Sequence, residues 1–170
     1  LEGGHDLDGE SRRCLEMALR NTLRLVGLVE DLADCTRARE GTFSVSPRRL
    51  PLAGVLRETA EELRAAAEQA CVALTVADTY PLRDAYADPQ RLRQVLVNLI
   101  GNALKFTPAG GTVRVAASED DADPRVLRVS VRDTGPGLTP EALARIFDRL
   151  YQGPSEHGGR RGLGLGLYIA

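Results

Sequence analysis

The N-terminal quarter of the chain carries a helical pattern of apolar positions. From about Ser11 to Arg39 they recur at alternating intervals of three and four residues, the heptad seam of a helical bundle. The first row is Leu15, Ala18, Thr22, Leu25, Val29 and Leu32, and a second row is Leu19, Val26 and Ala33. A helix this apolar needs a partner in water. Three partners stay open: a helix outside this stretch of chain, a helix of another subunit, or the domain that follows.

The remaining pattern alternates between helices and strands. Gly41 is placed to cap the first helix. We predict a short strand over 42–46, a linker over 47–51, helices over 52–70 and 89–106, and strands over 71–76, 112–117 and 126–131. The domain boundary is placed in the linker, which gives one part over 1–46 and a second over 47–170. Because the elements do not follow a regular βαβ order, the pattern favours an α+β sandwich.

Composition removes several classes of function. Lys and Arg number 22 against 24 Asp and Glu, so there is no basic excess of the kind that general nucleic-acid binders carry. No apolar run approaches the roughly 20 residues that span a bilayer, and no secretion signal is visible. Cys14, Cys35 and Cys71 are widely spaced, and His5 and His157 lie far from any cysteine pair. A zinc site or a disulfide framework is therefore not expected.

Three polar residues mark one face of the predicted helix 89–106, which Asp88 and Pro89 are placed to start. Asn98, Asn102 and Lys105 follow one another at intervals of four and three residues, beside the apolar arc of the helix. An asparagine oxygen suits Mg²⁺, and a lysine ammonium suits phosphate. A solvated helix face explains the same residues equally well, so both interpretations stay open here.

Two glycine-rich segments complete the candidate chemistry. The segment DTGPGL, 133–138, follows a strand and combines a carboxylate, which can accept from an exocyclic amine, with glycines; a plain turn is the alternative. The segment GLGLGL, 162–167, follows a loop that contains Arg160 and Arg161 and leads into an apolar stretch at 165–170 that can start a helix. Glycine amides at a helix start bind anions, and a flexible linker is the alternative.

In this order and spacing, the segments resemble the ATP-binding domain of sensor histidine kinases, in the GHKL ATPase superfamily. The stretch DPQRLRQVLVNLIGNALKFTPAGG resembles the N-box of that family, DTGPGL its G1 box, IFDRLYQ its F-box and GLGLGL its G2 box. The stretch ALRNTLRLVGLVEDLADCTRARE resembles the second helix of the family's dimerisation and phosphotransfer hairpin. The resemblance implies an α+β fold of the Bergerat type, a two-layer α/β sandwich, preceded by a long bundle-type helix.

The resemblance also implies roles for residues. Asp133 would accept a hydrogen bond from the adenine amino group, Asn102 would ligate Mg²⁺ with Asn98 in support, and Lys105 would lie near the phosphates. Asn98, Asn102 and Lys105 are the implied catalytic residues. The implied nucleotide-binding residues are these three with Asp133, Gly135, Gly137, Leu138, Phe147, Arg149, Gly162, Leu163, Gly164, Leu165 and Gly166. Leu150 stands where the F-box usually has a second phenylalanine.

The implied activity is phosphoryl transfer. ATP with Mg²⁺ would phosphorylate a histidine outside these residues, and the phosphoryl group would pass to an aspartate of a response regulator receiver domain. His5 lacks the proline that follows the family's phosphoacceptor, so His5 and His157 are both expected to be loop residues. The family's phosphoacceptor helix and its last two strands are likewise expected to lie outside this sequence, in a longer protein.

The full protein would be a homodimer through the hairpin. It would lie in the cytoplasm or form the cytoplasmic portion of a membrane receptor, and no nucleic-acid partner is implied. Two alternatives remain. One is a serine kinase of the same superfamily, against which the bundle-like helix argues. The other is a degenerate docking or dimerisation module, against which the intact Asn102, Asp133 and G2 glycines argue.

Overall fold

The computed structural model describes residues 8–40, 42, 44–77, 82–151 and 166–169, and the chain divides into two units between residues 43 and 44. The first unit is built on one long helix, α1 (Gly9–Arg39), as the heptad pattern predicted. The helix begins where the Ser11 backbone N–H donates to the Asp8 carboxylate over 2.7 Å. Much of the apolar seam is exposed: Leu15, Leu19, Leu25, Val26, Val29 and Leu32. Gly41, the predicted cap, lies outside the described residues.

The second unit opens with a short strand that lies later than predicted. Strand β1 is Arg48–Leu50, within the predicted linker, and it pairs antiparallel with β3 (Ala85–Ala87), which the sequence pattern did not reveal. The described residues of 42–46 form no strand and are exposed, whereas Leu50 is buried and has a partner in Ala85. Pairing with a distant strand therefore decides the position, and a three-residue strand is too short for its own periodicity to show.

The predicted helix 52–70 is two helices, α2 (Leu52–Glu62) and α3 (Arg64–Gln69), with Leu63 out of helical geometry at φ −90° and ψ 0°. Helix α3 ends in a Schellman motif. The Cys71 N–H donates to the Glu68 carbonyl, and the Val72 N–H donates to the Ala67 carbonyl. Cys71 takes the left-handed conformation, φ 53°, so the next strand, β2 (Ala73–Val76), begins two residues later than predicted.

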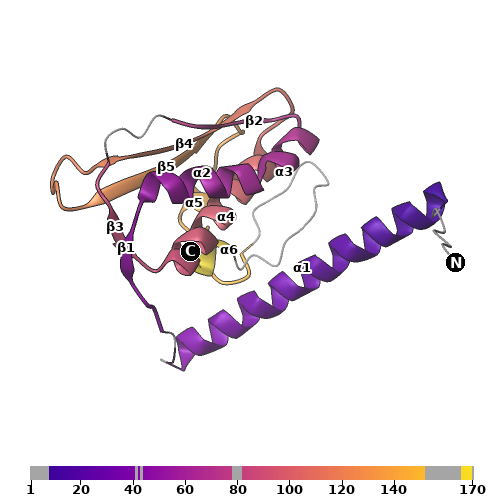
Figure 1. The fold of residues 1–170 in the computed structure, drawn as a ribbon, viewed down its shortest axis with the longest axis horizontal. Coiled ribbons are helices and arrows are strands. Elements are labelled where there is room, and N and C mark those ends of the chain that lie inside the picture. The colour runs from indigo at the N-terminus through magenta and orange to yellow at the C-terminus, as the bar shows by residue number, and fades with distance from the viewer. Residues whose placement is uncertain (1–7, 41, 43, 78–81, 152–165, 170) are drawn as a thin grey trace, which may run out of the picture. The chain divides into compact units, whose positions relative to one another are not determined.

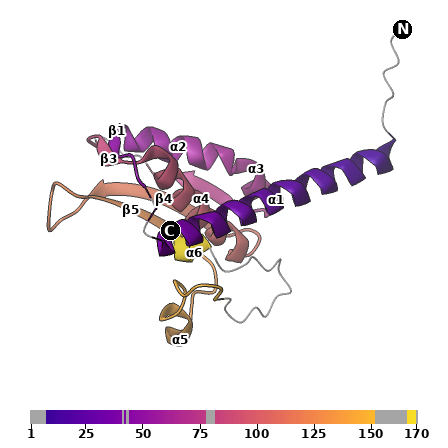
Figure 2. The same ribbon diagram turned by 90° about the horizontal axis from the view of Figure 1, so that it is seen from below.

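A three-stranded sheet forms one layer of this unit. Strand β4 (Thr112–Glu119) is central, parallel to β2 on one side and antiparallel to β5 (Leu127–Asp133) on the other. Val113 and Val115 of β4 are fully buried on the inner face, and Figures 1 and 2 show α2 and the long helix α4 (Pro89–Phe106) covering that face. The core consists of Leu52, Leu56, Ala67, Val72, Leu96, Ile100, Ala103, Leu104, Val113 and Val115.

Helix α4 has the predicted bounds and the predicted start. One oxygen of Asp88, Oδ1, accepts from the Gln90 and Arg91 N–H groups over 2.9 and 3.2 Å, and Pro89 occupies the first turn. The other oxygen, Oδ2, accepts from the Ser46 N–H over 2.8 Å. Asp88 therefore ties the chain before β1 to the helix that carries the candidate residues.

Two short helices complete the second unit. They are α5 (Pro140–Leu143) and α6 (Gly166–Ile169), and α6 lies beside α4 in both views (Figures 1 and 2). The mixture of helices and strands confirms the predicted α+β class. Within the described parts of the chain, no helix has the length and apolarity that crossing a membrane requires.

Asp88→Ala is expected to lower the thermal midpoint of unfolding at pH 7 by several degrees, because it removes the cap of α4 and the link to Ser46 together. The hydrogen bonds from Ser46 and Arg91 lower the pKa of the Asp88 carboxyl in the folded protein. Its stabilising effect is therefore present above about pH 4, the ordinary pKa of an aspartate, and is lost as the pH falls through the lowered folded pKa. Calorimetric scans between pH 7 and pH 3 should show the difference from wild type shrinking. The exposed Asp84→Ala is the control.

Candidate functional site

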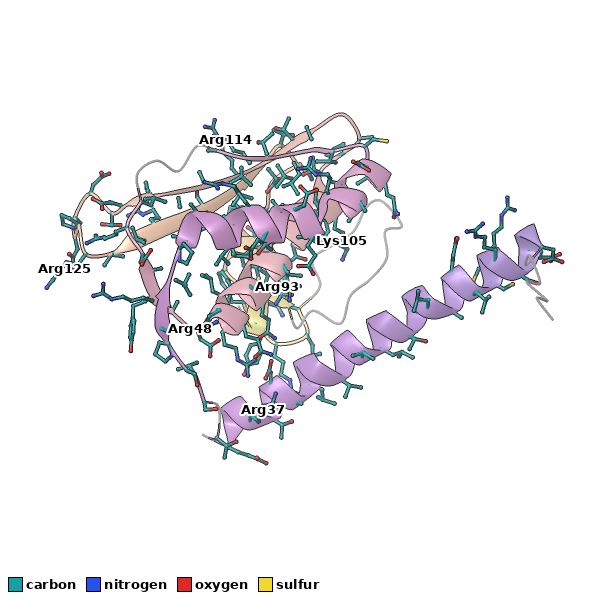
Figure 3. The ribbon with its side chains drawn as sticks, viewed as in Figure 1. Arg37, Arg48, Arg93, Lys105, Arg114 and Arg125 are labelled. Atoms are coloured by element: carbon teal, nitrogen blue, oxygen red, sulfur yellow. The ribbon has the colours of Figure 1, made fainter. Side chains whose placement is uncertain are left out.

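The three polar residues of α4 lie on one side of the helix, in different environments. The Asn98 side-chain amide donates to the Gly166 carbonyl over 3.0 Å and so joins α4 to the start of α6. The Asn102 side chain is half-buried and has no hydrogen-bond partner among the residues that the structure describes. Lys105, labelled in Figure 3, is exposed. Its Nζ lies 4.8 Å from the centre of the Phe106 ring. Asn102 and Lys105 thus keep polar groups available to a ligand.

Asp133 is the last residue of β5, and its carboxylate is held by the turn that follows. The Gly135 N–H donates to Asp133 Oδ1 over 2.8 Å, while no hydrogen bond to a described residue engages the second oxygen, Oδ2. Asp133 pairs with Val113 in the β4–β5 ladder, so its backbone position is fixed by the sheet. The side chain is exposed, and Oδ2 can accept a hydrogen bond from a ligand.

The loop after β5 runs against the C-terminal end of α4. A Cβ atom on Gly135 would lie 3.0 Å from the Phe106 carbonyl oxygen and 2.8 Å from Asp133 Oδ1, so a side chain there requires the backbone to move. Gly137 has φ 74°, the left-handed region that glycine adopts at little cost. The fold therefore brings DTGPGL to the end of the helix that bears Asn98, Asn102 and Lys105, which the sequence spacing alone does not establish.

The junction is the place where the DTGPGL loop, 133–138, meets the C-terminal end of α4. The sequence alone assigned no role to two residues there. They are Gly111, in the turn after α4, and Thr134, directly after Asp133. The Thr112 N–H donates to Thr134 Oγ1 over 2.9 Å, and a Cβ on Gly111 would lie 2.8 Å from the same oxygen. The threonine of DTGPGL and the glycine pair after a helix were visible in the sequence, but the approach of Thr134 to Gly111 depends on β4 pairing with β5.

The F-box residues lie in the segment that follows. Helix α5 is capped by Thr139, whose Oγ1 accepts from the Ala142 N–H over 3.3 Å. Phe147 is 62% exposed and Leu138 is 58% exposed, and Arg149 is also exposed. Leu150, the departure from the family pattern, takes the left-handed conformation at φ 62°, which is unusual for a large side chain. Phe147, Arg149 and Leu138 are thus exposed side chains.

The G2 segment is described only from Gly166 onward. Gly162, Leu163, Gly164, Leu165 and both histidines lie outside the described residues. Gly166 begins α6, and a Cβ on it would lie 3.2 Å from Asn98 Oδ1, so the helix start fits closely against Asn98. Gly166, the last glycine of the G2 segment, therefore lies next to α4.

Among the described residues, the site has no cluster of carboxylates that could hold a metal by itself. Nowhere in the described parts of the chain do three His, Cys, Asp or Glu side chains gather closely enough to hold an ion. A metal at Asn102 would take its other ligands from phosphate oxygens and water, which is the usual way in which Mg²⁺ binds with a nucleotide.

A shallow hollow between α2 and β2, lined by residues that include Arg57 and Arg64, lies at the β2 edge of the sheet, away from β5.

Comparisons with known proteins place the chain in a family. Residues 87–170 match the family of histidine kinase-, DNA gyrase B-, and HSP90-like ATPases. The adaptive-response sensory kinase SasA of Synechococcus elongatus is 33% identical over 144 residues, which are 84% of this chain and 36% of SasA. The signal transduction histidine-protein kinase AfsQ2 of Streptomyces coelicolor is 36% identical over 171 residues, which are 99% of this chain and 29% of AfsQ2.

A solved structure is similar to the chain in both sequence and fold. Full-length ShkA, in complex with AMPPNP, superposes with a TM-score of 0.74 at 38% identity, over 96% of this chain and 33% of ShkA. The chain belongs to the histidine kinase-, DNA gyrase B-, and HSP90-like ATPase family, and the two curated relatives named above are a sensory kinase and a signal transduction histidine-protein kinase. The predicted GHKL fold is confirmed, and the chain spans about a third of the length of SasA and of ShkA.

Proposed function

We propose that this chain binds ATP with Mg²⁺ and forms the ATPase region of a sensor histidine kinase. The observation that carries the proposal is the contact between the Asp133 loop and the end of α4. Gly135 packs against the Phe106 carbonyl while its N–H fixes Asp133 Oδ1, which leaves Oδ2 to accept from the adenine amino group. The carboxylate that we assign to base recognition therefore lies beside the end of the helix that carries the polar face.

The phosphate side of the proposal rests on α4 and α6. Asn102 has a half-buried amide without a partner among the described residues, and Lys105 carries an exposed ammonium near the end of the same helix. Mg²⁺, when bound, would neutralise part of the triphosphate charge. Asn98 holds the start of α6 at Gly166, and we assign the preceding glycines of the G2 segment to the phosphates on the strength of the family resemblance.

In the full protein, the γ-phosphorus would be attacked in line by a neutral histidine nitrogen. The bond from phosphorus to the bridging oxygen breaks as the P–N bond forms, ADP leaves with the electron pair, and the histidine proton passes to a base. The phosphoryl group would then move to an aspartate of a response regulator receiver domain, and the kinase would be a homodimer through the hairpin. Membership among sensor histidine kinases supports these steps.

Calorimetric titration with Mg·ADP tests the proposal. The wild-type chain should bind Mg·ADP, and chelation of Mg²⁺ should weaken binding about tenfold, as expected when one charge-assisted interaction is lost. Asn102→Ala should weaken binding in Mg²⁺ by a similar factor and add nothing once Mg²⁺ is removed. Asn21→Ala, an exposed change on α1, is the matched control.

The outcomes separate the two parts of the proposal. A folded wild-type chain that does not bind Mg·ADP would contradict the ATP site and would favour a docking module. Binding that depends on Mg²⁺ equally in wild type and in Asn102→Ala would contradict the metal role of Asn102 alone.

A further inference from the structure

Thr134 takes part in the β4–β5 ladder in an unusual way. Its backbone N–H donates to the Thr112 carbonyl over 3.1 Å, as an ordinary antiparallel partner would. The Thr112 N–H, however, donates to the Thr134 side-chain oxygen over 2.9 Å. The hydroxyl thus stands where a backbone carbonyl accepts in a regular pair, and the main chain at 134 is free to turn away from the sheet.

Because the Thr134 hydroxyl accepts in place of the backbone carbonyl, the chain can turn after Thr134, and this turn holds the Asp133 carboxylate. Directly after Thr134, the Gly135 N–H folds back onto Asp133 Oδ1 over 2.8 Å, and Gly135 reaches the Phe106 carbonyl at the end of α4. A main chain that continued straight along β4 would not bring Gly135 back to Asp133. The direction of the Asp133 carboxylate therefore depends on the turn that begins at Thr134.

The Thr134 hydroxyl also borders the turn that follows α4. A Cβ atom on Gly111 would lie 2.8 Å from Thr134 Oγ1 and 2.4 Å from Thr107 Cγ2, so both threonines line the space that the missing side chain of Gly111 leaves. Thr107 is buried, and its own hydroxyl donates to the Ala103 carbonyl over 2.7 Å, at the end of α4. The Thr134 hydroxyl thus lies between its partner Thr112 on β4 and the turn after α4.

We propose that Thr134 is a positioning residue for base recognition. Its hydroxyl replaces a ladder carbonyl, turns the chain, and sets Asp133 against the end of α4 so that Oδ2 faces the ligand. Thr134 itself need not touch the nucleotide. This inference rests on the proposed function, because it assigns Asp133 to the adenine amino group.

Thr134→Val and Thr134→Ser test the proposal together. Valine keeps the shape of threonine and removes the acceptor, whereas serine keeps the acceptor and removes the methyl group. The affinities for Mg·ADP and Mg·GDP are measured by calorimetry for each variant. Thr134→Val should lower the preference for ADP over GDP about tenfold, or about 1.4 kcal/mol. Thr134→Ser should restore it to within about twofold of wild type.

Amide hydrogen exchange gives a second readout that needs no nucleotide. In Thr134→Val the Thr112 N–H loses its acceptor, and the turn that holds the Gly135 N–H against Asp133 Oδ1 is weakened. Both amides should therefore exchange about tenfold faster or more. Amides in the middle of β4 should not change. Thr75→Val, the same substitution at an exposed site on β2 whose hydroxyl lies 3.5 Å from the Val113 carbonyl, is the control and should alter neither readout.

Each outcome decides the proposal. Unchanged base preference or an unchanged Gly135 amide in Thr134→Val would overturn it, as would a Thr134→Ser protein as impaired as Thr134→Val. If the wild-type chain binds no nucleotide, the proposed function fails by itself. The exchange of the Gly135 amide then still shows whether the hydroxyl holds the Asp133 turn.

Discussion

Asp133→Asn is expected to weaken binding of Mg·ADP by about 100-fold, the factor that loss of a strong hydrogen bond to a charged acceptor produces. The asparagine Oδ1 can still accept from the Gly135 N–H, so the turn is retained. The second position, however, becomes an NH₂ group that meets the adenine amino group donor to donor. Calorimetric titration of wild type and variant under the same conditions measures the effect.

The control for this change is Asp121→Asn, which removes one exposed carboxylate in the turn between β4 and β5. It should bind Mg·ADP as wild type does, since only the net charge has changed. Base preference adds a second check, because guanine has a carbonyl where adenine has its amino group. Equal affinity of the wild-type chain for ADP and GDP would contradict the role assigned to Asp133.

The sequence predicted the long elements well, for a physical reason. Helix α4 has eighteen residues with a clear apolar arc and a side-chain cap at Asp88, so periodicity and capping agree on its bounds. Strands β1 and β3 have three residues each and depend on one another across 35 or more residues of chain. The break at Leu63 leaves no local sign either, because no glycine or proline marks it.

In the candidate site, too, the sequence predicts local relations between residues but not contacts that depend on distant pairing. Spacing placed Asn98, Asn102 and Lys105 on one face of α4, because that relation is local to a helix. The contact of Gly135 with the Phe106 carbonyl, and that of Thr134 with Gly111, require the β4–β5 register. Glycines at 111 and 135 were therefore visible as glycines, but the atoms that exclude a side chain there are set by the fold.

Gly111→Ala is expected to destabilise the protein by about 3 kcal/mol, near the upper end of the usual cost of overpacking. The added Cβ would lie 2.4 Å from Thr107 Cγ2, 2.8 Å from Thr134 Oγ1 and 2.9 Å from the Pro108 carbonyl oxygen. Thr107 is buried and its hydroxyl is hydrogen-bonded to the Ala103 carbonyl, whereas the Pro108 atom is a backbone oxygen. Neither neighbour can therefore simply rotate away. Urea unfolding followed by circular dichroism measures the change in the free energy of unfolding.

Gly101→Ala supplies the matched control for this prediction, because it makes the same substitution inside α4 at a position where, apart from the adjoining residues and the backbone of the helix itself, no atom lies within 4 Å of the added Cβ. Alanine there should stabilise the protein by up to about 1 kcal/mol, since glycine is a poor helix former. Opposite signs for the two variants would show that crowding at the junction, and not the loss of a glycine, is responsible. A Gly111→Ala protein within about 0.5 kcal/mol of wild type, the scatter of ordinary surface changes, would mean that the junction between α4 and the Asp133 loop yields easily.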